Sequence, residues 1–408
     1  MSQTSFHERR FGLLATLALA QYLPMILQAD AIPPRSAEIA AKQAEKAKHL
    51  TSYQPNSVER IVTRVHPQGF ENPPVGFYPW LGSIYADGSA AAGTGYRRPY
   101  GNNGVFDLHG AWSIKNYKLL DASLHLPEMR AGYFATELTG TYIDAPQVAY
   151  YGVGNKTRKA DKTAFDYQPM TIGFMEIFRP MSWLSLGGGF QYLEIETKAA
   201  KGFRPSIENK FTQTTAPGLG TDPAYTCAHA YAEINWRQPV RYSIKGGSYR
   251  FEWTSFNRTG EDRSFDFRRF DIEIKQFFPI RRGNQGIALR GLASTTGVAK
   301  GREVPFFLMP MLGGGQEMRG FADYRFRDRH RLLLTSEYRW RPSKFLDMAL
   351  FYEAGKVASR TRELNLDEMH TCYGIGARIH APYAIVLRVE VAHSIEGTRL
   401  LLCGGDVF

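Results

Sequence analysis

One segment, residues 313–328, combines the residue types needed for a buried ionic contact. It reads GGGQEMRGFADYRFRD, so that Arg319 stands between Met318 and Gly320 just after a run of glycines. Glycine permits tight backbone packing. The guanidinium of arginine is planar and permanently charged, and its fork of donors matches a carboxylate. The segment therefore indicates a folded, inserted loop whose arginine binds an acidic partner, rather than a solvated turn.

The sequence lacks the residue patterns of the common hydrolytic and metal-dependent enzymes. It has no G-x-S-x-G or H-E-x-x-H motif, and its ten histidines are scattered. We interpret the adjacent His393 and Ser394 as coincidental. Cys227, Cys372 and Cys403 have no metal-like spacing, and an odd number fits no complete disulfide framework. The sequence therefore predicts a protein that is not an enzyme and has neither metal nor cofactor.

The N-terminal region has the pattern of an export signal followed by a leader. Residues 1–31 combine a positively charged start, a mostly apolar run and a small-residue cleavage site at Ala29 to Ala31, as in a secretory signal peptide. Residues 32–76 predict a periplasmic leader, in which residues 36–50 are compatible with one short amphipathic helix. This leader is too short for a folded domain of ordinary size.

Charge and hydropathy narrow the class of protein further. No segment after the signal approaches the roughly 20 continuous apolar residues of a transmembrane helix. The mean hydropathy of -0.33 suits a soluble exported protein, and also a membrane barrel, in which every second residue faces lipid. The net charge of +11 does not indicate nucleic acid in an exported chain. We expect the charge to face acidic lipid, including lipopolysaccharide, or an anion-attracting lumen.

From about residue 77 onward, the sequence shows the period-two alternation of β-strands. Phe270, Ile272 and Ile274 alternate with charged residues, and the same pattern recurs over residues 249–254 and 385–391. A soluble sandwich would bury the apolar face. A membrane barrel would turn that face to lipid and place the charges in a watery lumen.

The connections between strands favour the membrane barrel. Several are long and polar, near residues 144–162, 198–222 and 358–369, whereas those opposite are short and contain proline. The corner prolines are Pro99, Pro127, Pro180, Pro239, Pro279, Pro342 and Pro382. Short turns at one rim and long loops at the other are typical of outer-membrane barrels. Seven proline corners and eight opposite connections predict an all-β, sixteen-stranded antiparallel transmembrane barrel over residues 77–408. Its last strand would run to Phe408 and close the wall.

These features resemble the BamA/TamA-type outer-membrane assembly barrels, also called the bacterial surface antigen family. Met318 to Phe321 after the glycine run is similar to the V/L-R-G-F/Y motif in the sixth extracellular loop of that family. The strand count puts this motif between strands 11 and 12, the position of that loop in the family. Four further segments resemble family patterns: YYGVGN (150–155), SEYRWRP (336–342), FYEAG (351–355) and YGIGARIHAPYAIVLRVEVA (373–392).

The resemblance implies a set of site residues. The loop would fold into the lumen, where Arg319 would bind Glu353, a glutamate in place of the usual aspartate. The expected loop latch consists of Arg319, Gly320, Phe321, Glu353 and Gly355. Glu337 and Arg378 are expected to face the lumen.

The resemblance also implies a function, with two departures from the family pattern. A bacterial outer-membrane protein of this kind would aid insertion or transfer of protein or lipid, in contact with outer-membrane lipid, lipopolysaccharide and other outer-membrane proteins. A seam between the first and last strands, weakened by Gly93, Gly95, Gly404 and Gly405, would open toward the bilayer. However, the periplasmic polypeptide-transport (POTRA) modules of such proteins do not fit in the leader, and Asp406 replaces an apolar or aromatic residue. A passive channel and a structural surface protein remain as alternatives.

Overall fold

The computed structural model describes residues 75–408 except residues 131, 239–242, 281–283, 344–345, 382–383 and 406. The predicted signal peptide (1–31) lies outside the described residues, as does the predicted leader (32–76) apart from its last two residues. Within them, sixteen strands form one antiparallel sheet, as predicted, and two short strands form a separate ladder. No helix of the described part is long and apolar enough to cross a membrane.

The wall strands, in sheet order, are β1 (Gly76–Ser83), β2 (Ala90–Tyr100), β3 (Gly104–Ser113), β4 (Lys118–His125), β5 (Phe134–Tyr150), β6 (Thr163–Met181), β7 (Leu184–Ala199), β8 (Ala224–Asn235), β9 (Gly246–Arg258), β10 (Phe267–Ile280), β11 (Gln285–Val298), β14 (His330–Trp340), β15 (Leu346–Ala358), β16 (His370–Ala381), β17 (Ala384–Ser394) and β18 (Gly397–Cys403). The second ladder pairs β12 (Met311–Leu312) with β13 (Phe326–Arg327). Short helical turns are η2 (Lys159–Asp161), η3 (Ile207–Asn209), η4 (Phe306–Leu308) and η5 (Thr361–Glu363).

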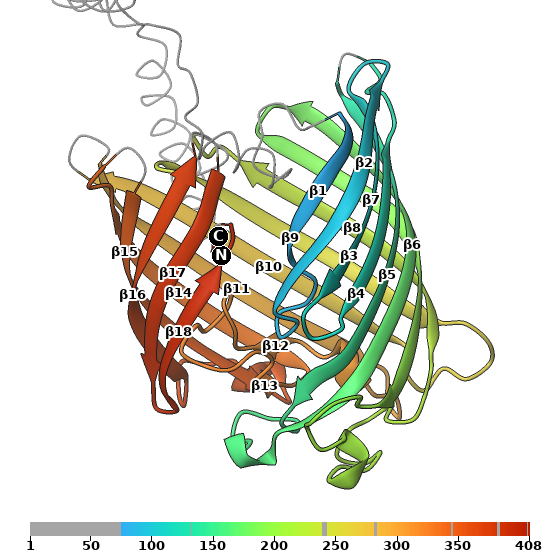
Figure 1. Cartoon of the computed structure of the whole chain (residues 1–408). Coiled ribbons are helices and arrows are strands. Elements are labelled where there is room, and N and C mark those ends of the chain that lie inside the picture. Colours follow the sequence, from blue (N-terminus) through green and yellow to red (C-terminus); the bar gives the residue numbers. More distant parts are fainter. Residues whose placement is uncertain are drawn as a thin grey trace, which may run out of the picture. The chain divides into compact units, whose positions relative to one another are not determined.

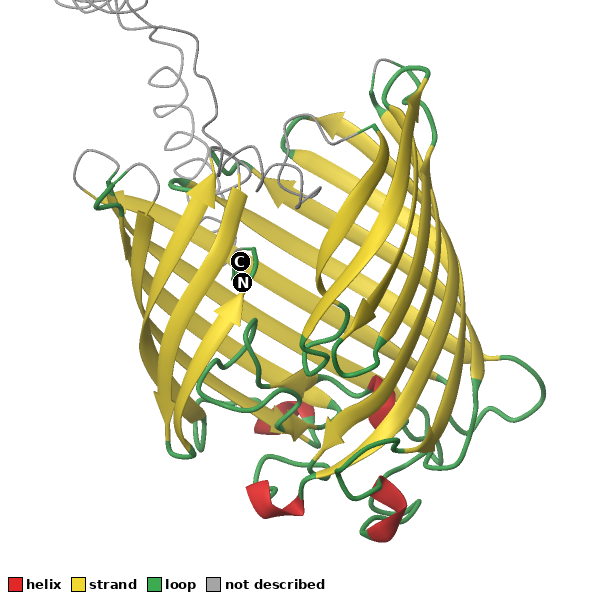
Figure 2. Cartoon of the chain, viewed as in Figure 1, coloured by secondary structure: helices red, strands yellow, loops and turns green. Residues whose placement is uncertain are grey.

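The two rims of the barrel differ as the sequence predicts. Long connections join β5 to β6, β7 to β8, β11 to β14 and β15 to β16 at one rim, which also carries the short helical turns (Figures 1 and 2). Five of the corner prolines lie at or near the ends of strands at the opposite rim, while Pro239 and Pro382 lie outside the described residues. Proline lacks a backbone donor and so belongs where strand pairing ends.

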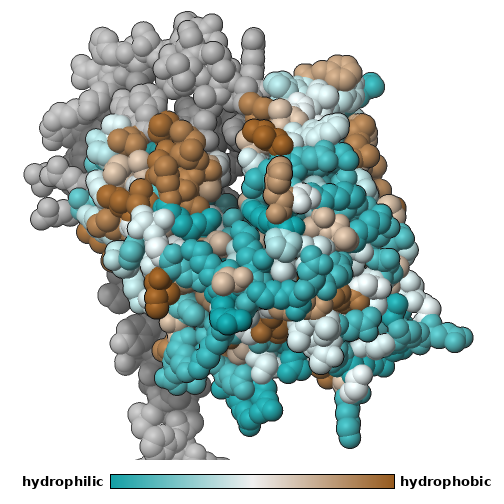
Figure 3. Space-filling model, turned by 60° about the horizontal axis from the view of Figure 1, so that its bottom comes forward, coloured by the Kyte–Doolittle hydropathy of each residue, from teal (hydrophilic) through white to brown (hydrophobic). Residues whose placement is uncertain are grey.

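Successive side chains of each strand point to opposite faces of the wall, so the outer face is apolar and the inner face is polar. On β10, Phe270 and Ile274 are exposed on the outside, where they face lipid. Between them, Asp271 and Glu273 lie on the inner face in ion pairs with Arg269 and Arg290. Figure 3 shows hydrophilic side chains over much of the long-loop end and hydrophobic ones gathered on the outer wall.

An aromatic core fills the lumen near the long-loop rim. The loops after β7 and β11 contribute buried Ile207, Leu219 and Phe306, which pack with wall residues including Tyr150. Arg327 is also buried there: it donates to the carbonyl of Phe306 at 2.9 Å and lies 5.4 Å from the Tyr150 ring. Buried aromatic contacts and a desolvated cation over rings stabilise such a core. The long loops thus pack as part of the interior.

The sheet ends at two short strands. β1 has 8 residues and β18 has 7, against 19 in β6, and no ladder among the described residues joins β18 to β1. In Figure 1 the far wall is visible between these two edges. The prediction that the last strand runs to Phe408 is wrong. The strand ends at Cys403, Gly405 takes a positive φ of 75°, and Phe408 is buried against Phe277 of β10.

Candidate functional site: a loop latch in the lumen

The loop between β11 and β14 (residues 299–329) positions the arginine. Its tip begins at the β12–β13 ladder and turns sharply at Gly313 and Gly314, whose φ angles are 114° and 111°. A Cβ atom at Gly313 would lie 2.2 Å from the carbonyl oxygen of Ala322, so only glycine permits this close turn. The tip is thereby aimed at the inner faces of β14 to β17.

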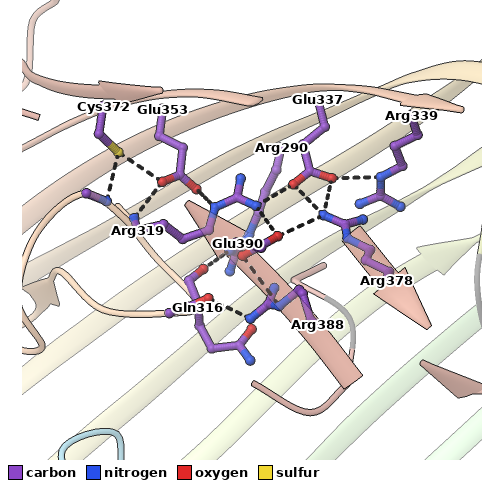
Figure 4. Close-up of polar contacts among 12 residues, drawn as sticks. Arg290, Gln316, Arg319, Glu337, Arg339, Glu353, Cys372, Arg378, Arg388 and Glu390 are labelled. Carbon is purple, nitrogen blue, oxygen red and sulfur yellow. Dashed lines mark hydrogen bonds and ion pairs between the residues drawn. The ribbon is translucent and has the colours of Figure 1, made fainter. Parts of the chain in front are cut away.

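Arg319 is completely buried and touches three wall carboxylates (Figure 4). Its Nε lies 2.9 Å from Glu353 Oε1, and its backbone N–H donates to Glu353 Oε2 at 2.6 Å. Its Nη1 lies 2.7 Å from Glu337 and 2.9 Å from Glu390. The guanidinium also lies 3.4 Å from the ring centre of Phe351. Burying the arginine is tolerable because opposite charges and hydrogen bonds surround it.

The three carboxylates depend on the loop to different degrees. Glu337 also pairs with Arg339 at 2.7 Å and with Arg378 at 2.8 Å. Glu390 pairs with Arg378 at 3.4 Å and with Arg388 at 3.5 Å. Among the described residues, Glu353 has no arginine or lysine partner other than Arg319. Its remaining side-chain contact is the thiol of Cys372 at 3.2 Å.

The other expected latch residues pack around this ion pair. The N–H of Gly320 donates to Cys372 Sγ at 3.3 Å, and its carbonyl accepts from Ser394 Oγ at 2.8 Å. A Cβ atom at Gly320 would lie 2.4 Å from Cys372 Cβ, which explains the need for glycine. Phe321 is buried beside Phe326. A Cβ atom at Gly355 would lie 2.6 Å from Met318 Sδ, so the loop lies directly on β15.

The structure thus brings together all five expected latch residues, and it places Glu337 and Arg378 on the inner face beside them. Sequence reasoning missed Glu390, Cys372 and Ser394. The alternation of the strand over residues 385–391 already put Glu390 on the charged face, but that signal does not distinguish a latch partner from any other lumenal acid. Nothing in the sequence pattern singles out Cys372 or Ser394.

Two further arginines hold the backbone of the loop tip. Arg290 of β11 donates to the carbonyl of Gln316 at 3.0 Å, and Arg388 of β17 donates to that of Gly315 at 2.7 Å (Figure 4). The tip therefore connects β11, β14, β15, β16 and β17 on their inner faces. Among the described residues, no group of acids, histidines and cysteines could hold a metal ion. The arrangement is suited to bracing the wall.

The edge strand β1 is held from the inside by a separate contact. Tyr78 donates to Asp107 Oδ1 of β3 at 2.8 Å, and Arg97 of β2 binds the other oxygen at 2.6 Å. Gly95 makes room for the tyrosine ring, since a Cβ atom there would lie 2.3 Å from Tyr78 Cζ. Trp80 stacks on His109 at 5.8 Å. β1 is thus fixed to β2 and β3.

The motifs and the lumenal loop now have a counterpart in known proteins. The Omp85 superfamily domain matches residues 149–398, which is more than half of the chain and includes the loop and its wall partners. The chain belongs to the Omp85 superfamily. It is therefore a bacterial outer-membrane β-barrel. In such barrels the short turns lie in the periplasm and the long loops lie outside.

Solved structures agree with this Omp85 fold. BamA from Haemophilus ducreyi lacking POTRA domains 1-3 is similar at 15% identity and a TM-score of 0.59, with 81% of this chain and 69% of that chain covered. CdiB from Escherichia coli is similar at 12% identity and a TM-score of 0.52, with 83% of this chain and 66% of that chain covered. This chain thus spans about two thirds of either compared chain. No curated protein sequence matches it.

Proposed function

We propose that this Omp85 barrel aids the insertion of membrane-protein segments into the outer membrane, and that its wall opens toward the bilayer between β1 and β18. The observation that carries the proposal is the pair of sheet edges, since no ladder joins them among the described residues. An edge strand presents unpaired N–H and C=O groups, which form a template for another strand. Omp85 barrels as a class act in insertion or secretion at this membrane.

Details of the two edges support such an opening. Pro79 lies inside β1, where its missing donor removes one hydrogen bond from the ladder that an edge could form. β18 consists of seven residues before the backbone departs at Gly404. A short seam with few hydrogen bonds costs less free energy to open than a ladder between long strands such as β5 and β6.

The latch supports the proposal in a second way. An opening at one seam is useful only if the rest of the wall keeps its register. Arg319 joins the inner faces of β14, β15 and β17, which stand beside the β18 edge. On the other side, Asp107 of β3 bonds side chains of both β1 and β2. Motion would then be confined to the seam.

The aromatic core argues against a passive channel, the first alternative. Loop residues such as Phe306 and Leu219 occupy the extracellular end of the lumen, and Arg327 is buried among the rings. Water-filled pores need an open polar path.

In the described part of the latch, the acids and arginines are bonded to one another, and Cys372 and Ser394 are hydrogen-bonded to Gly320. We therefore propose a non-enzymatic role without cofactor.

We further propose that outer-membrane lipid, lipopolysaccharide and other outer-membrane proteins are its partners. The extracellular end carries exposed lysines, Lys156 and Lys201 in loops and Lys198 near the end of β7. Each pairs with a neighbouring carboxylate, and their positive charge also suits the phosphate groups of lipopolysaccharide. The apolar outer face suits the lipid chains. Client strands would meet the barrel at β1 and β18.

Reconstituted vesicles test the insertion proposal. A urea-unfolded eight-stranded outer-membrane barrel is added to vesicles with or without this protein, and its folding is followed by the heat-modifiable band on a gel. Vesicles that contain the protein should fold the client faster. In a Cys403→Ser background, Leu81→Cys and Leu400→Cys then place one thiol on the lipid face of each edge strand, and a long bis-maleimide bridges them. Bridging should abolish the acceleration.

The matched control bridges two strands that are already paired. Phe251→Cys and Ile272→Cys stand opposite each other on β9 and β10, also on the lipid face. This bridge should leave client folding fast. The proposal is refuted if the protein does not accelerate folding, or if the seam bridge has no more effect than the control bridge. High conductance of the unmodified protein in planar bilayers would support a channel instead.

A further inference from the structure

The C-terminal tail (residues 404–408) ends inside the lumen. Val407 and Phe408 are 5% and 8% exposed, and they form one apolar cluster with Phe277 of β10 and Ala288 of β11. The rings of Phe408 and Phe277 are 6.1 Å apart. The tail therefore occupies a defined apolar site on the wall, several strands away from β18 in the sheet.

Two arginines flank the terminal ring. The guanidinium carbons of Arg290 and Arg339 lie 5.8 and 4.8 Å from the centre of the Phe408 ring. Arginine over an aromatic face is attracted by the ring quadrupole, and more so in a desolvated site. The site thus holds Phe408 by two side chains as well as by apolar packing.

The same two arginines also belong to the latch network. Arg290 donates to the carbonyl of Gln316 in the loop tip, and Arg339 pairs with Glu337, a carboxylate that binds Arg319. The strand register makes the two sites adjacent, since Ala288 of the tail site stands directly opposite Glu337. Each arginine therefore contacts the tail and a member of the latch network at once.

The loop tip also lies against the end of the strand from which the tail departs. A Cβ atom at Gly315 would lie 2.9 Å from Cys403 Sγ, the last residue of β18. Backbone atoms of the tip thus abut β18 directly. Displacement of β18 or of the tail would remove contacts from both sides of the loop tip.

We propose that the C-terminal tail is a releasable ligand of its own barrel, coupled to the latch through Arg290 and Arg339. Release of Phe408 frees both arginines to move, which loosens the loop, and withdrawal of the loop likewise weakens the hold on Phe408. The tail is short and contains Gly404 and Gly405, so its release is a local opening that leaves the wall folded. This coupling does not depend on the proposed insertion activity.

Native Cys372 reports the loop position, because its thiol lies beneath the N–H of Gly320. The folded protein in detergent is treated with a maleimide, and labelling of Cys372 is followed by peptide mass spectrometry. In the wild type, labelling should be slow. Phe408→Ala should speed it by about tenfold, as expected when two cation–π contacts and a ring are lost.

The reverse readout uses the chain end itself. Carboxypeptidase should release Phe408 slowly from the wild type and faster from Phe277→Ala. This variant weakens the tail site without changing the tail sequence, and it replaces Phe408→Ala if that variant does not fold. Phe277→Ala should also speed labelling of Cys372. Phe278→Ala is the matched control, because Phe278 is the next residue of β10 and faces lipid. A heat-modifiable band confirms that each barrel is folded.

The results separate this coupling from its alternatives. Faster Cys372 labelling in Phe408→Ala or Phe277→Ala, with Phe278→Ala at the wild-type rate, supports the proposal. Wild-type labelling in a folded variant whose tail carboxypeptidase removes readily would refute the coupling. Rapid removal of Phe408 from the wild type itself would refute the tail site.

Discussion

Replacing Arg319 by alanine should destabilise the barrel strongly, and the wall partners give the magnitude. Without Arg319, Glu337 and Glu390 each keep another arginine, but Glu353 keeps no charged partner among the described residues. One uncompensated buried charge costs about 3–5 kcal/mol. Loss of the contact with the Phe351 ring adds up to about 2 kcal/mol. We therefore expect a loss near the upper end of 3–5 kcal/mol in the free energy of unfolding.

A double-mutant cycle tests this reasoning directly. Urea unfolding in detergent, followed by tryptophan fluorescence and by the heat-modifiable band, gives the free energy of each variant. In Arg319→Ala with Glu353→Gln, the stranded charge is gone. The double variant should therefore be more stable than the sum of the single changes by about 1–3 kcal/mol.

Arg263→Ala is the matched control for the loop arginine. The Arg263 side chain is 49% exposed and lies 3.9 Å from Asp266, so its removal should cost about 0–1 kcal/mol. In Arg319→Ala, protease should also cut within residues 313–328 while the rest of the barrel stays intact. The reasoning fails if Arg319→Ala matches Arg263→Ala in stability and the loop stays protected, or if the cycle is additive.

Three further substitutions probe separate parts of the structure. Gly320→Ala puts a Cβ atom 2.4 Å from Cys372 Cβ, so the loop must withdraw, and faster protease cleavage of the loop should follow. Gly95→Ala meets the ring of Tyr78 at 2.3 Å and should raise amide hydrogen exchange in β1, with β10 unchanged. Arg327→Ala removes the cation from the aromatic core and should raise conductance in planar bilayers above that of the wild type; equal conductance would mean that the core does not seal the lumen.

Much of the wall could be predicted from the sequence because lipid and lumen impose opposite chemistry on alternate residues. Phe270, Ile272 and Ile274 stand on the lipid side of β10 for this reason. The corner prolines allowed the strands to be counted, because a residue without a backbone N–H donor marks the place where strand pairing ends. The rule is local, so it works without knowledge of the tertiary structure.

The site could be predicted only in part. The pair Arg319–Glu353 followed from a resemblance to a family. Glu390 was missed because the lumenal faces of the strands carry many acids. Which of these acids contacts the loop depends on the curvature of the barrel. Cys372 acts through a weak hydrogen bond that no sequence pattern encodes.

The end of the chain shows why a local pattern can mislead. An aromatic last residue suits the lipid face of a closing strand, and it equally suits an apolar site inside the lumen. The sequence contains Phe277 and Ala288 more than a hundred residues earlier, but only the register of β10 and β11 makes them neighbours. Gly404 and Gly405 permit either path, so the outcome depends on tertiary contacts.

A buried ionic latch and an apolar one differ in how precisely each fixes the position of the loop. Burying charges gains little stability over apolar packing, since desolvation offsets the attraction, but the charges must be matched one by one. Arg319 fits only where Glu353, Glu337 and Glu390 converge, so a loop shifted by one position would strand a charge. The latch therefore specifies a single loop position. An apolar plug of similar area would tolerate sliding, and a barrel whose seam opens as proposed could not then hold the rest of its wall in register.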